Sequence, residues 1–594
     1  MSLDINNLHL VPTIDPRIDI QKLSKLLYGV QSSGVDNLFK VFPIDGANAN
    51  NFSVTANPSN RGVFMDRRIY LQYQFELTFN GASNAVGLAA PLLQCPGLTK
   101  GPGITNLGNA YYDAPRAYGL SNSLSTISVL LNGQGVNTNL QQYIRALTRY
   151  SNNVECQDQL LGFSPTMLDQ SQQYSDLNGF ARNPLREYGD NVLQCPRGGF
   201  INAVVLRNDV TLGAAPATAV VRLTLLEPLY LSPFLNMCRT EEPGFVQVDT
   251  MSVTGVFSGR GQTNQGLVST LWSHSTLSLS TFSSFNVIAV PGNCKLMYFE
   301  IQPPIDMRIP PTIVYDYVEP YYLQNQQGSL AAFPGPGNSV DGLTSDNIQL
   351  GSIPDRVYIW VAERDQDFDF TKTDTFLGIT SVSVIFNSKS GILNTADQQM
   401  LYNLSVRNRT NSNYRQFIKD VGSVICLRFG EDIPLNNLLT PGSRGSFNFQ
   451  VKLNVTNNYT RAVVPTVNTL FIYTGTFTVS NGRCMKEVGI LTQNDVLNTI
   501  NSGEAPVESP PPYNALASGF GGSMSGGFAW NDFIRFLKRA GRTAINVGKF
   551  AIPKIAPQYT PVVEAADILA KQAGFGTAVG GKKLSRSQML KMLK

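Results

Sequence analysis

The chain has 594 residues, of which 42% are hydrophobic and only 15% charged, and it contains 51 Gly and 34 Pro. Such low charge argues against a coiled coil or helical bundle, and the apolar content is too high for wholesale disorder. The net charge of +4 is uneven, because the segment from Phe528 to Lys594 holds 12 Lys/Arg against 3 Asp/Glu and leaves the rest of the chain mildly acidic.

After an N-terminal arm expected over residues 1–45, the chain is predicted to consist mainly of β-strands. From Ile69 to Phe79, apolar residues alternate with mostly polar ones, which is typical of a long half-buried strand. Similar alternation occurs at Val357–Val361 and Phe447–Val455. Helical patterns are few, the clearest being Leu140–Leu147 and Ala396–Leu404, and Gly- and Pro-rich stretches predict long loops.

Four short features recur in the same order in the two halves of this β region. They are Asp66–Leu71 with Asp355–Ile359, Ile127–Gly133 with Val382–Ser388, Arg197–Phe200 with Arg444–Phe447, and Val220–Leu231 with Leu470–Val479. The common order favours a duplicated β domain over residues 46–240 and 241–500, although strand and turn sequences are limited enough to converge. Two copies of this size fit two β-sandwiches side by side better than a solenoid.

Several stretches within residues 45–500 resemble the double jelly-roll major capsid proteins of virophages and Polinton-like viruses. They are Leu229–Leu235, Leu271–Ser275, Ile309–Tyr315 and Gly422–Leu427. The resemblance implies an all-β fold of two tandem eight-stranded jelly rolls with long loops and a few short helices. It also implies a homotrimer that packs as a pseudo-hexagon in an icosahedral virion, with neighbouring trimers, penton proteins and minor cement proteins as partners.

Chemistry within the β region is sparse. The chain has two His and seven scattered Cys without a CxxC spacing, so we expect reduced, mostly buried thiols, no catalytic residues and no cofactor. His274, beside Trp272, is expected to be packed in the structure. Asp365, Asp367 and Asp369 alternate along the chain, which suits either a solvated face or a Ca²⁺ site.

The N-terminus lacks the basic and apolar regions of a secretory signal, and no apolar run reaches the roughly 18 residues of a transmembrane helix. We therefore expect a protein made in the interior of the host cell and incorporated into the virion. A carbohydrate-binding or hydrolytic β-sandwich protein is the alternative, since two carboxylates in a cleft would suffice for glycoside hydrolysis.

Residues 501–527 read as a Pro- and Gly-rich linker. Pro510, Pro511, Pro512 and Tyr513 form a PPxY sequence, the ligand type of WW domains, which dock extended polyproline segments at little entropic cost. This motif suggests a host WW-domain ubiquitin ligase as a partner, and the alternative is a stiff spacer.

The linker ends in a sequence that resembles the maturation-protease site of adenovirus. A hydrophobic residue, any residue and two glycines precede the cut in such sites, and the corresponding residues here are Met524, Ser525, Gly526 and Gly527, followed by Phe528. Glycines allow an extended chain to enter a narrow cleft. The resemblance implies cleavage after Gly527 by a viral cysteine protease.

The segment 528–594 begins with a basic amphipathic helix pattern. One face holds Trp530, Phe533, Ile534 and Leu537, and the other holds Arg535, Lys538, Arg539 and Arg542. This pattern is typical of helices that lie in a membrane interface. With the preceding cleavage site, it resembles the adenovirus internal membrane-lytic protein.

The sequence therefore predicts a precursor major capsid protein whose tail is released and disrupts a host membrane. A helix packed under the capsomer and a genome-binding arm that uses the positive charge are the alternatives for the tail.

Overall fold

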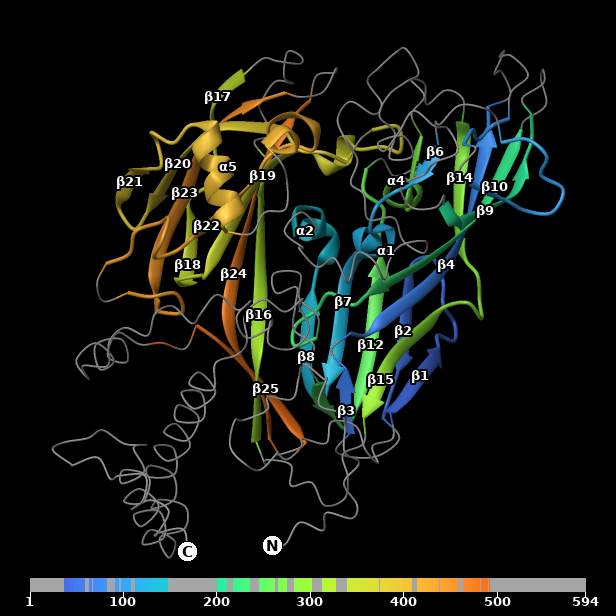
Figure 1. Ribbon diagram of the computed structural model, residues 1–594, viewed down its shortest axis with the longest axis horizontal. Helices are drawn as coiled ribbons and strands as arrows, with labels where there is room; N and C mark the ends of the chain where they lie inside the picture. Colours follow the sequence, from blue (N-terminus) through green and yellow to red (C-terminus); the bar gives the residue numbers. More distant parts are fainter. Residues whose placement is uncertain are drawn as a thin grey trace, which may run out of the picture. The chain divides into compact units, whose positions relative to one another are not determined.

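The computed structural model describes most of the chain between residues 37 and 491 (Figure 1). The described residues are 37–58, 63–66, 68–82, 91–95, 98–107, 113–147, 200–210, 217–234, 245–261, 265–274, 282–301, 312–326, 339–372, 374–408, 414–436, 439–457, 463–480, 482–489 and 491. All belong to the first of two units, residues 1–509, and the second, residues 510–594, lies outside them. No helix among the described residues is long and apolar enough to cross a membrane.

The first jelly roll consists of two sheets around a common core, antiparallel except where β5 pairs with β9. One has the order β1 (Asn37–Pro43), β15 (Lys295–Ile301), β4 (Tyr70–Gly81) and β10 (Thr218–Pro228). The other has the order β2 (Asn51–Thr55), β12 (Met251–Phe257), β7 (Leu124–Leu131) and β8 (Gln134–Thr138). The first sheet is extended by β3 (Val63–Asp66), β5 (Leu98–Lys100), β9 (Phe200–Asn208), β11 (Phe245–Val248) and β14 (Phe282–Ala289).

Short elements close the ends of this jelly roll. They are the paired strands β6 (Asp113–Pro115) and β13 (Trp272–His274), and the helices α1 (Gly119–Ser123), α2 (Leu140–Leu147) and α4 (Val268–Leu271). Helix α2 has the bounds that its apolar periodicity predicts.

The second jelly roll has the same strand order. Its first sheet runs β16 (Thr312–Asn325), β24 (Pro465–Ser480), β19 (Arg356–Glu363) and β22 (Val424–Arg428), and β25 (Arg483–Val488) also pairs with β24. Its second sheet holds β17 (Ser339–Thr344), β18 (Ile348–Ser352), β23 (Arg444–Thr456), β20 (Gly378–Phe386) and β21 (Lys389–Ile392). Helical elements are η3 (Asp365–Asp367), α5 (Gln398–Arg407) and η4 (Gln416–Asp420).

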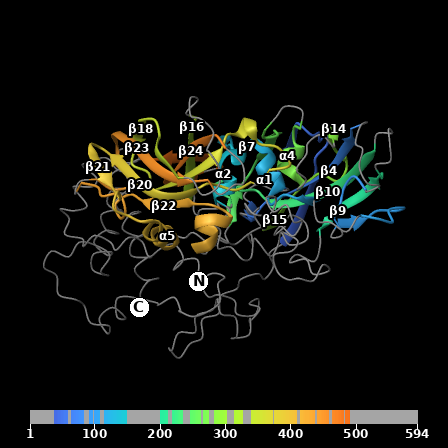
Figure 2. The same cartoon turned by 90° about the horizontal axis from the view of Figure 1, so that it is seen from above.

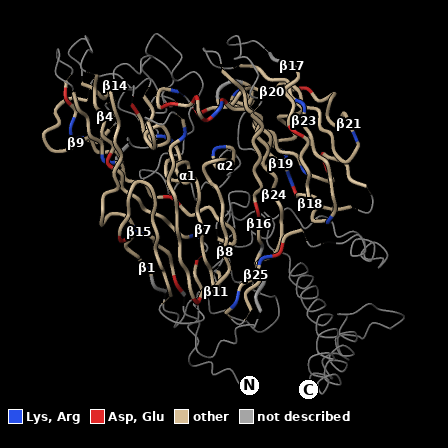
Figure 3. The backbone as a smooth tube through the Cα atoms, turned by 180° about the vertical axis from the view of Figure 1, so that it is seen from behind, with Lys and Arg blue, Asp and Glu red and all other residues tan. Residues whose placement is uncertain are grey.

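Burial along the strands follows what each face contacts. In β4 buried and half-buried residues alternate through the whole strand, as its sequence predicts. In β19 the expected alternation of burial is absent, and every residue after Arg356 is buried. The inward side chains of β19 fill the core of the second jelly roll, and the outward ones, such as Trp360, join the core of the first. Charged residues are sparse along the strands (Figure 3).

The predicted fold class of two tandem jelly rolls is confirmed, but two of the four sequence repeats do not match equivalent strands. Strands β4 and β19, and β7 and β20, occupy the same positions in their sheets. Strand β9 lies beside β10, whereas β23 corresponds to β12, and β24 corresponds to β15 rather than to β10. Alternating apolar strands resemble one another whatever their place in the sheet.

The mismatch moves the boundary between the jelly rolls. Strands β11, β12, β14 and β15 follow residue 240, yet all pair with strands of the first jelly roll. The expected boundary at 240/241 therefore does not separate the two sheet systems. The chain passes from one to the other between Ile301 and Thr312.

Candidate functional site at the seam between the jelly rolls

The residues predicted to carry the chemistry of the tail lie outside the described residues. This applies to the PPxY motif, the cleavage sequence 524–528 and the amphipathic helix from Trp530. The strongest concentration of buried charge in the described chain lies instead at the contact between the two jelly rolls, which we call the seam.

The two jelly rolls lie side by side at the seam (Figures 1 and 2), and the contact between them is first an apolar one. The outward face of the sheet β16-β24-β19-β22 belongs to the same buried core as the first jelly roll. Its contributors include Tyr317, Tyr358, Trp360, Ile472 and Phe477. Burying such side chains contributes about 1.5–3 kcal/mol each, so the seam is a large share of the stability of the pair.

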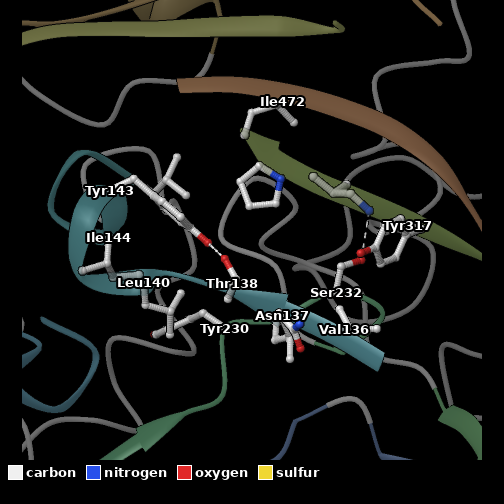
Figure 4. Close-up of a pocket in the computed structure, with 14 residues that line it drawn as sticks. Val136, Asn137, Thr138, Leu140, Tyr143, Ile144, Tyr230, Ser232, Tyr317 and Ile472 are labelled. Carbon is white, nitrogen blue, oxygen red and sulfur yellow. Dashed lines mark hydrogen bonds between the residues drawn. The ribbon is translucent and has the colours of Figure 1, made fainter. Parts of the chain in front are cut away.

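A small cavity of about 30 Å³ marks where α2 and β8 meet the second jelly roll. Figure 4 shows Tyr143 and Thr138 of the first jelly roll on one side and Tyr317 and Ile472 of the second on the other. The backbone N–H of Val318 donates to the Ser232 hydroxyl at 3.0 Å, which ties β16 to the first jelly roll. The volume suits one or two water molecules and not an organic ligand.

Beside the cavity, two buried arginines of the first jelly roll share the carboxylate of Asp374 from the second. Arg145, on α2, approaches Asp374 at 2.7 Å, and Arg260 approaches it at 3.0 Å. Asp365, which is more exposed, lies 3.1 Å from Arg260 and 3.6 Å from Arg145. Burial alone would raise the pKa of Asp374, but the guanidinium groups of Arg145, Arg260 and Arg116 outweigh it, so this pKa lies well below its usual range.

A third arginine, Arg116, holds the backbone of the same loop of the second jelly roll. Its guanidinium donates to the carbonyl of Lys372 at 2.7 Å and to that of Asp369 at 3.3 Å. The centre of the Phe368 ring lies 4.7 Å from the guanidinium of Arg116 and 4.2 Å from that of Arg260. These cation–π contacts satisfy the faces of the guanidinium groups that hydrogen bonds leave free.

Gly261 shows how closely the two backbones approach at this point. Its φ is +94°, and a Cβ there would lie 1.9 Å from the Phe368 carbonyl oxygen. Only glycine permits both the conformation and the contact.

The predicted packed role of His274 is confirmed. Its ring Nδ1 lies 2.7 Å from the buried Asp113 carboxylate, which also accepts from the Trp272 indole at 3.0 Å. Its backbone N–H donates to the Phe370 carbonyl of the second jelly roll at 2.8 Å, and its ring stacks on Phe370. The ring Nε2 is buried without a hydrogen-bond partner, so this His–Asp pair is arranged as a structural element.

The three alternating carboxylates do not converge on a metal position. Asp365 pairs with Arg260, Asp367 pairs with Arg364 at 2.8 Å, and Asp369 accepts from the Thr371 backbone at 2.8 Å. Among the described residues no group of three His, Cys, Asp or Glu is placed to hold a metal ion. The alternative prediction, that all three carboxylates lie on a solvated face, is wrong for Asp369, because its side chain is buried.

Sequence reasoning missed the arginine–carboxylate network because its partners lie about a hundred or more residues apart, as in the pairs Arg260–Asp365 and Arg145–Asp374. One local signal existed: Arg145 interrupts the apolar face of a short helix, where a charge requires a buried partner. The network orients and locks two domains, and it presents no substrate cleft.

Comparisons with known proteins agree with this architecture. The family described as Sputnik virophage major capsid protein 1st domain matches residues 7–298, and the major capsid protein V20 C-terminal domain matches residues 320–475. The putative capsid protein V20 of Sputnik virophage is 26% identical over 637 aligned positions, covering 99% of each chain.

Solved structures show the same fold. A chain of the Sputnik virophage particle has a TM-score of 0.69 at 27% identity, covering 86% of this chain and 99% of that one. The mavirus major capsid protein has a TM-score of 0.61 at 15% identity, covering 84% and 98%.

Two jelly rolls of the same strand order, fused in one chain and joined by a buried seam, define the double jelly-roll class of capsid proteins. The first and second jelly rolls match models of virophage major capsid protein domains, and the whole chain is similar to a virophage capsid protein.

Proposed function

We propose that this chain is the shell-forming capsid protein of a virophage-type particle and that three copies form a pseudo-hexagonal capsomer. The observation that carries the proposal is the seam, which fixes two equivalent jelly rolls in one unit. Three such units supply six similar positions around one axis. Full-length similarity to a virophage capsid protein supports the same assignment.

The capsomer is tested by native mass spectrometry of the purified full-length chain. With a chain mass of 64.9 kDa, a trimer is expected near 195 kDa. A chain that stays monomeric at all accessible concentrations would contradict the trimer. The shell is tested by co-expressing this chain with the penton and cement proteins. Electron microscopy of the product should then show closed particles.

For the tail, the proposal is cleavage after Gly527 by a cysteine protease, followed by binding of residues 528–594 to a host membrane. The sequence Met524–Phe528 and the aromatic and basic faces of the following helix pattern support it. Intact-mass spectrometry of purified particles is expected to give two products that meet at Gly527. A single mass for all 594 residues would make the tail a permanent part of the capsid protein.

Membrane activity has its own test. The peptide 528–550 is expected to release dye from anionic vesicles and much less from neutral ones, because each basic residue adds about 1 kcal/mol near an anionic surface. A peptide with Trp530→Ala and Phe533→Ala is the matched control for the apolar face. Intact vesicles with the unchanged peptide would refute the membrane role and favour the genome-binding or packing alternatives.

The PPxY motif at Pro510–Tyr513 supports recruitment of a WW-domain ubiquitin ligase. Binding of the full-length chain to an isolated WW domain, with Tyr513→Ala as the control, tests this contact. Equal binding of both chains would reduce the motif to a spacer.

A further inference from the structure

A groove opens at one edge of the second jelly roll. One wall comes from β16, between Tyr321 and Asn325, and the other comes from the turn between β17 and β18, residues 345–349. Val467 and Thr469 of β24 complete the lining. Its volume of about 360 Å³ lies within the range of small-ligand sites, roughly 300–1,000 Å³, whereas the seam cavity holds only about 30 Å³.

Alternation along β16 separates this groove from the seam. Tyr322 stacks on Trp360 at the seam. Successive side chains of a strand point to opposite faces, so Tyr321, Leu323 and Asn325 lie on the other face of β16. These three residues line the groove on the side away from the seam.

Tyr321 offers an aromatic ring that is backed on one side and accessible to a ligand. Its ring stacks on that of the buried Phe471, which lies opposite it in the ladder, with ring centres 6.5 Å apart and planes inclined by 30°. Tyr321 is nevertheless 45% exposed. A ring held in this way has little freedom left to lose when a ligand stacks on it.

The polar side chains of the groove can both donate and accept hydrogen bonds. Gln324, Asn325 and Asn347 are amides, and Thr469 adds a hydroxyl. Within the described residues the three amides have no hydrogen-bond partner, so their capacity is free. Each amide supplies an acceptor oxygen and two donor hydrogens, and the hydroxyl of a sugar is likewise both donor and acceptor.

The charge of the lining narrows the chemical class of the ligand. Asp346 is its one charged residue, and neither Lys nor Arg lines the groove in the described chain. An anionic ligand such as a phosphate would need a basic partner. A metal ion would need several carboxylates or imidazoles, and the described residues contain no such group. A neutral ligand with many hydroxyl groups and an apolar ring face fits both the amides and Tyr321.

The corresponding edge of the first jelly roll is filled by its own chain. There β1 leads into β2 through a short turn, in which Ala47 is buried. The Tyr73 hydroxyl donates to the backbone carbonyl of Asn48 in the same turn at 2.6 Å. The two jelly rolls share one strand order, so the open groove is a property of these residues of the second jelly roll and not of the fold.

We infer that this groove binds a neutral oligosaccharide, with one sugar ring stacked on Tyr321 and its hydroxyl groups bonded to Asn325, Asp346 and Asn347. The apolar C–H face of the sugar packs on the aromatic ring, as apolar groups do on tyrosine at other binding surfaces. This binding function goes beyond shell formation and does not depend on the capsomer. In a shell each copy would present one such groove, and many weak sites acting together bind a glycan-covered surface firmly.

Saturation-transfer NMR of the full-length chain tests the inference. Chitotriose, lactose and maltotriose are the neutral probes, and glucuronic acid is the anionic control. At least one neutral probe is expected to receive saturation at millimolar concentration, most strongly at the C–H protons of one ring, and glucuronic acid is expected to receive none. The absence of transfer to all neutral probes would overturn the inference, and so would equal transfer to glucuronic acid.

Substitutions test whether the binding lies in the groove. Tyr321→Ala is expected to weaken binding of the best probe about tenfold, whereas Tyr321→Phe keeps the ring and should bind within about twofold of the unchanged chain. Asn347→Ala is expected to weaken binding roughly fivefold. The matched control is Tyr414→Ala, at a tyrosine that is 40% exposed outside the groove and should not affect binding. Equal affinity of Tyr321→Ala and the unchanged chain would overturn the inference.

The melting temperature separates a lost site from a lost fold. Tyr321 and Asn347 are exposed, so their variants are expected to melt with the unchanged chain. If Tyr321→Ala melts earlier, Asn347→Ala decides, and full affinity in that variant would overturn the inference. Oligosaccharide binding by a chain that never trimerises would uphold the groove and refute the capsomer, so the two proposals fail separately.

Discussion

The substitution Asp374→Asn is the most direct test of the seam. It preserves the shape of the side chain and removes the charge that Arg145 and Arg260 share at 2.7 and 3.0 Å. Breaking a buried pair by removing one partner costs about 3–5 kcal/mol, because the remaining charge stays buried without compensation. Asp365 still neutralises part of the arginine charge, but it is 38% exposed, so we expect a loss near the lower end, about 3 kcal/mol.

Thermal unfolding followed by tryptophan fluorescence measures this loss. Trp360 stacks on Tyr322 and packs against Phe376 at the seam, so its emission reports separation of the jelly rolls. For a domain of this size, about 3 kcal/mol corresponds to a fall in Tm of roughly 6–12 °C. The matched control is Glu431→Gln, which removes an exposed partner of Arg428 and is expected to cost under about 1 kcal/mol. Equal shifts for the two variants would refute the reasoning.

The pH dependence of the same variant has a defined sign. The pKa of Asp374 is lower in the folded chain than in the unfolded chain, so its contribution is fully present above the unfolded pKa of about 3.9. The contribution is lost only as the pH falls below that value toward the folded pKa. The difference in Tm between the unchanged chain and Asp374→Asn should stay constant from pH 8 to pH 5 and shrink below about pH 4. A difference that disappears at pH 6 would contradict the assignment.

Three further predictions concern buried groups and close contacts. Glu300 is fully buried and neither carboxylate oxygen has a hydrogen-bond partner, so Glu300→Met should raise Tm. Glu227 accepts from two backbone N–H groups of α1, so Glu227→Met should lower Tm by several degrees. A lower Tm for both variants would contradict the prediction for Glu300. Gly261→Ala should destabilise the folded chain by roughly 2 kcal/mol or more, because the added methyl group would meet the Phe368 carbonyl across the seam. The control Gly103→Ala has a similar φ but open space around it and should cost about 1 kcal/mol. Equal losses of stability in urea unfolding would count against the close contact. Burial raises the pKa of the Cys484 thiol to about 11, so iodoacetamide at pH 8 should modify it roughly 100-fold more slowly than a free cysteine, as followed by mass spectrometry.

The fold could be predicted where local pattern determines structure. The alternation in β4 and the apolar face of α2 each specify one element with little outside information. The boundary between the jelly rolls could not be read in this way. Its position depends on β15 pairing with β1, and only that long-range register distinguishes β15 from β10 as the closing strand. Both strands are rich in apolar residues, and neither sequence shows which strand it pairs with.

The seam was beyond local sequence reasoning for a related cause. Asp365, Asp367 and Asp369 look alike along the chain, yet one pairs with an arginine of the first jelly roll, one with a near neighbour, and one is buried. Which role each takes depends on what the opposing domain presents. The spacing of carboxylates alone therefore predicts a cation site equally well.

A contact inside one chain and a contact between chains are under different physical constraints. The seam forms within one chain, where the linked partner is present at high effective concentration, so it can include buried charges such as Arg145 and Asp374 despite their desolvation cost. A contact between chains must instead leave each copy soluble before assembly. The outward face of β1 and β15 fits that constraint, because Phe39 and Phe299 are exposed apolar side chains there. A buried ion pair such as Arg145–Asp374 therefore suits a contact inside one chain, whereas an exposed apolar face suits a contact that forms only on assembly.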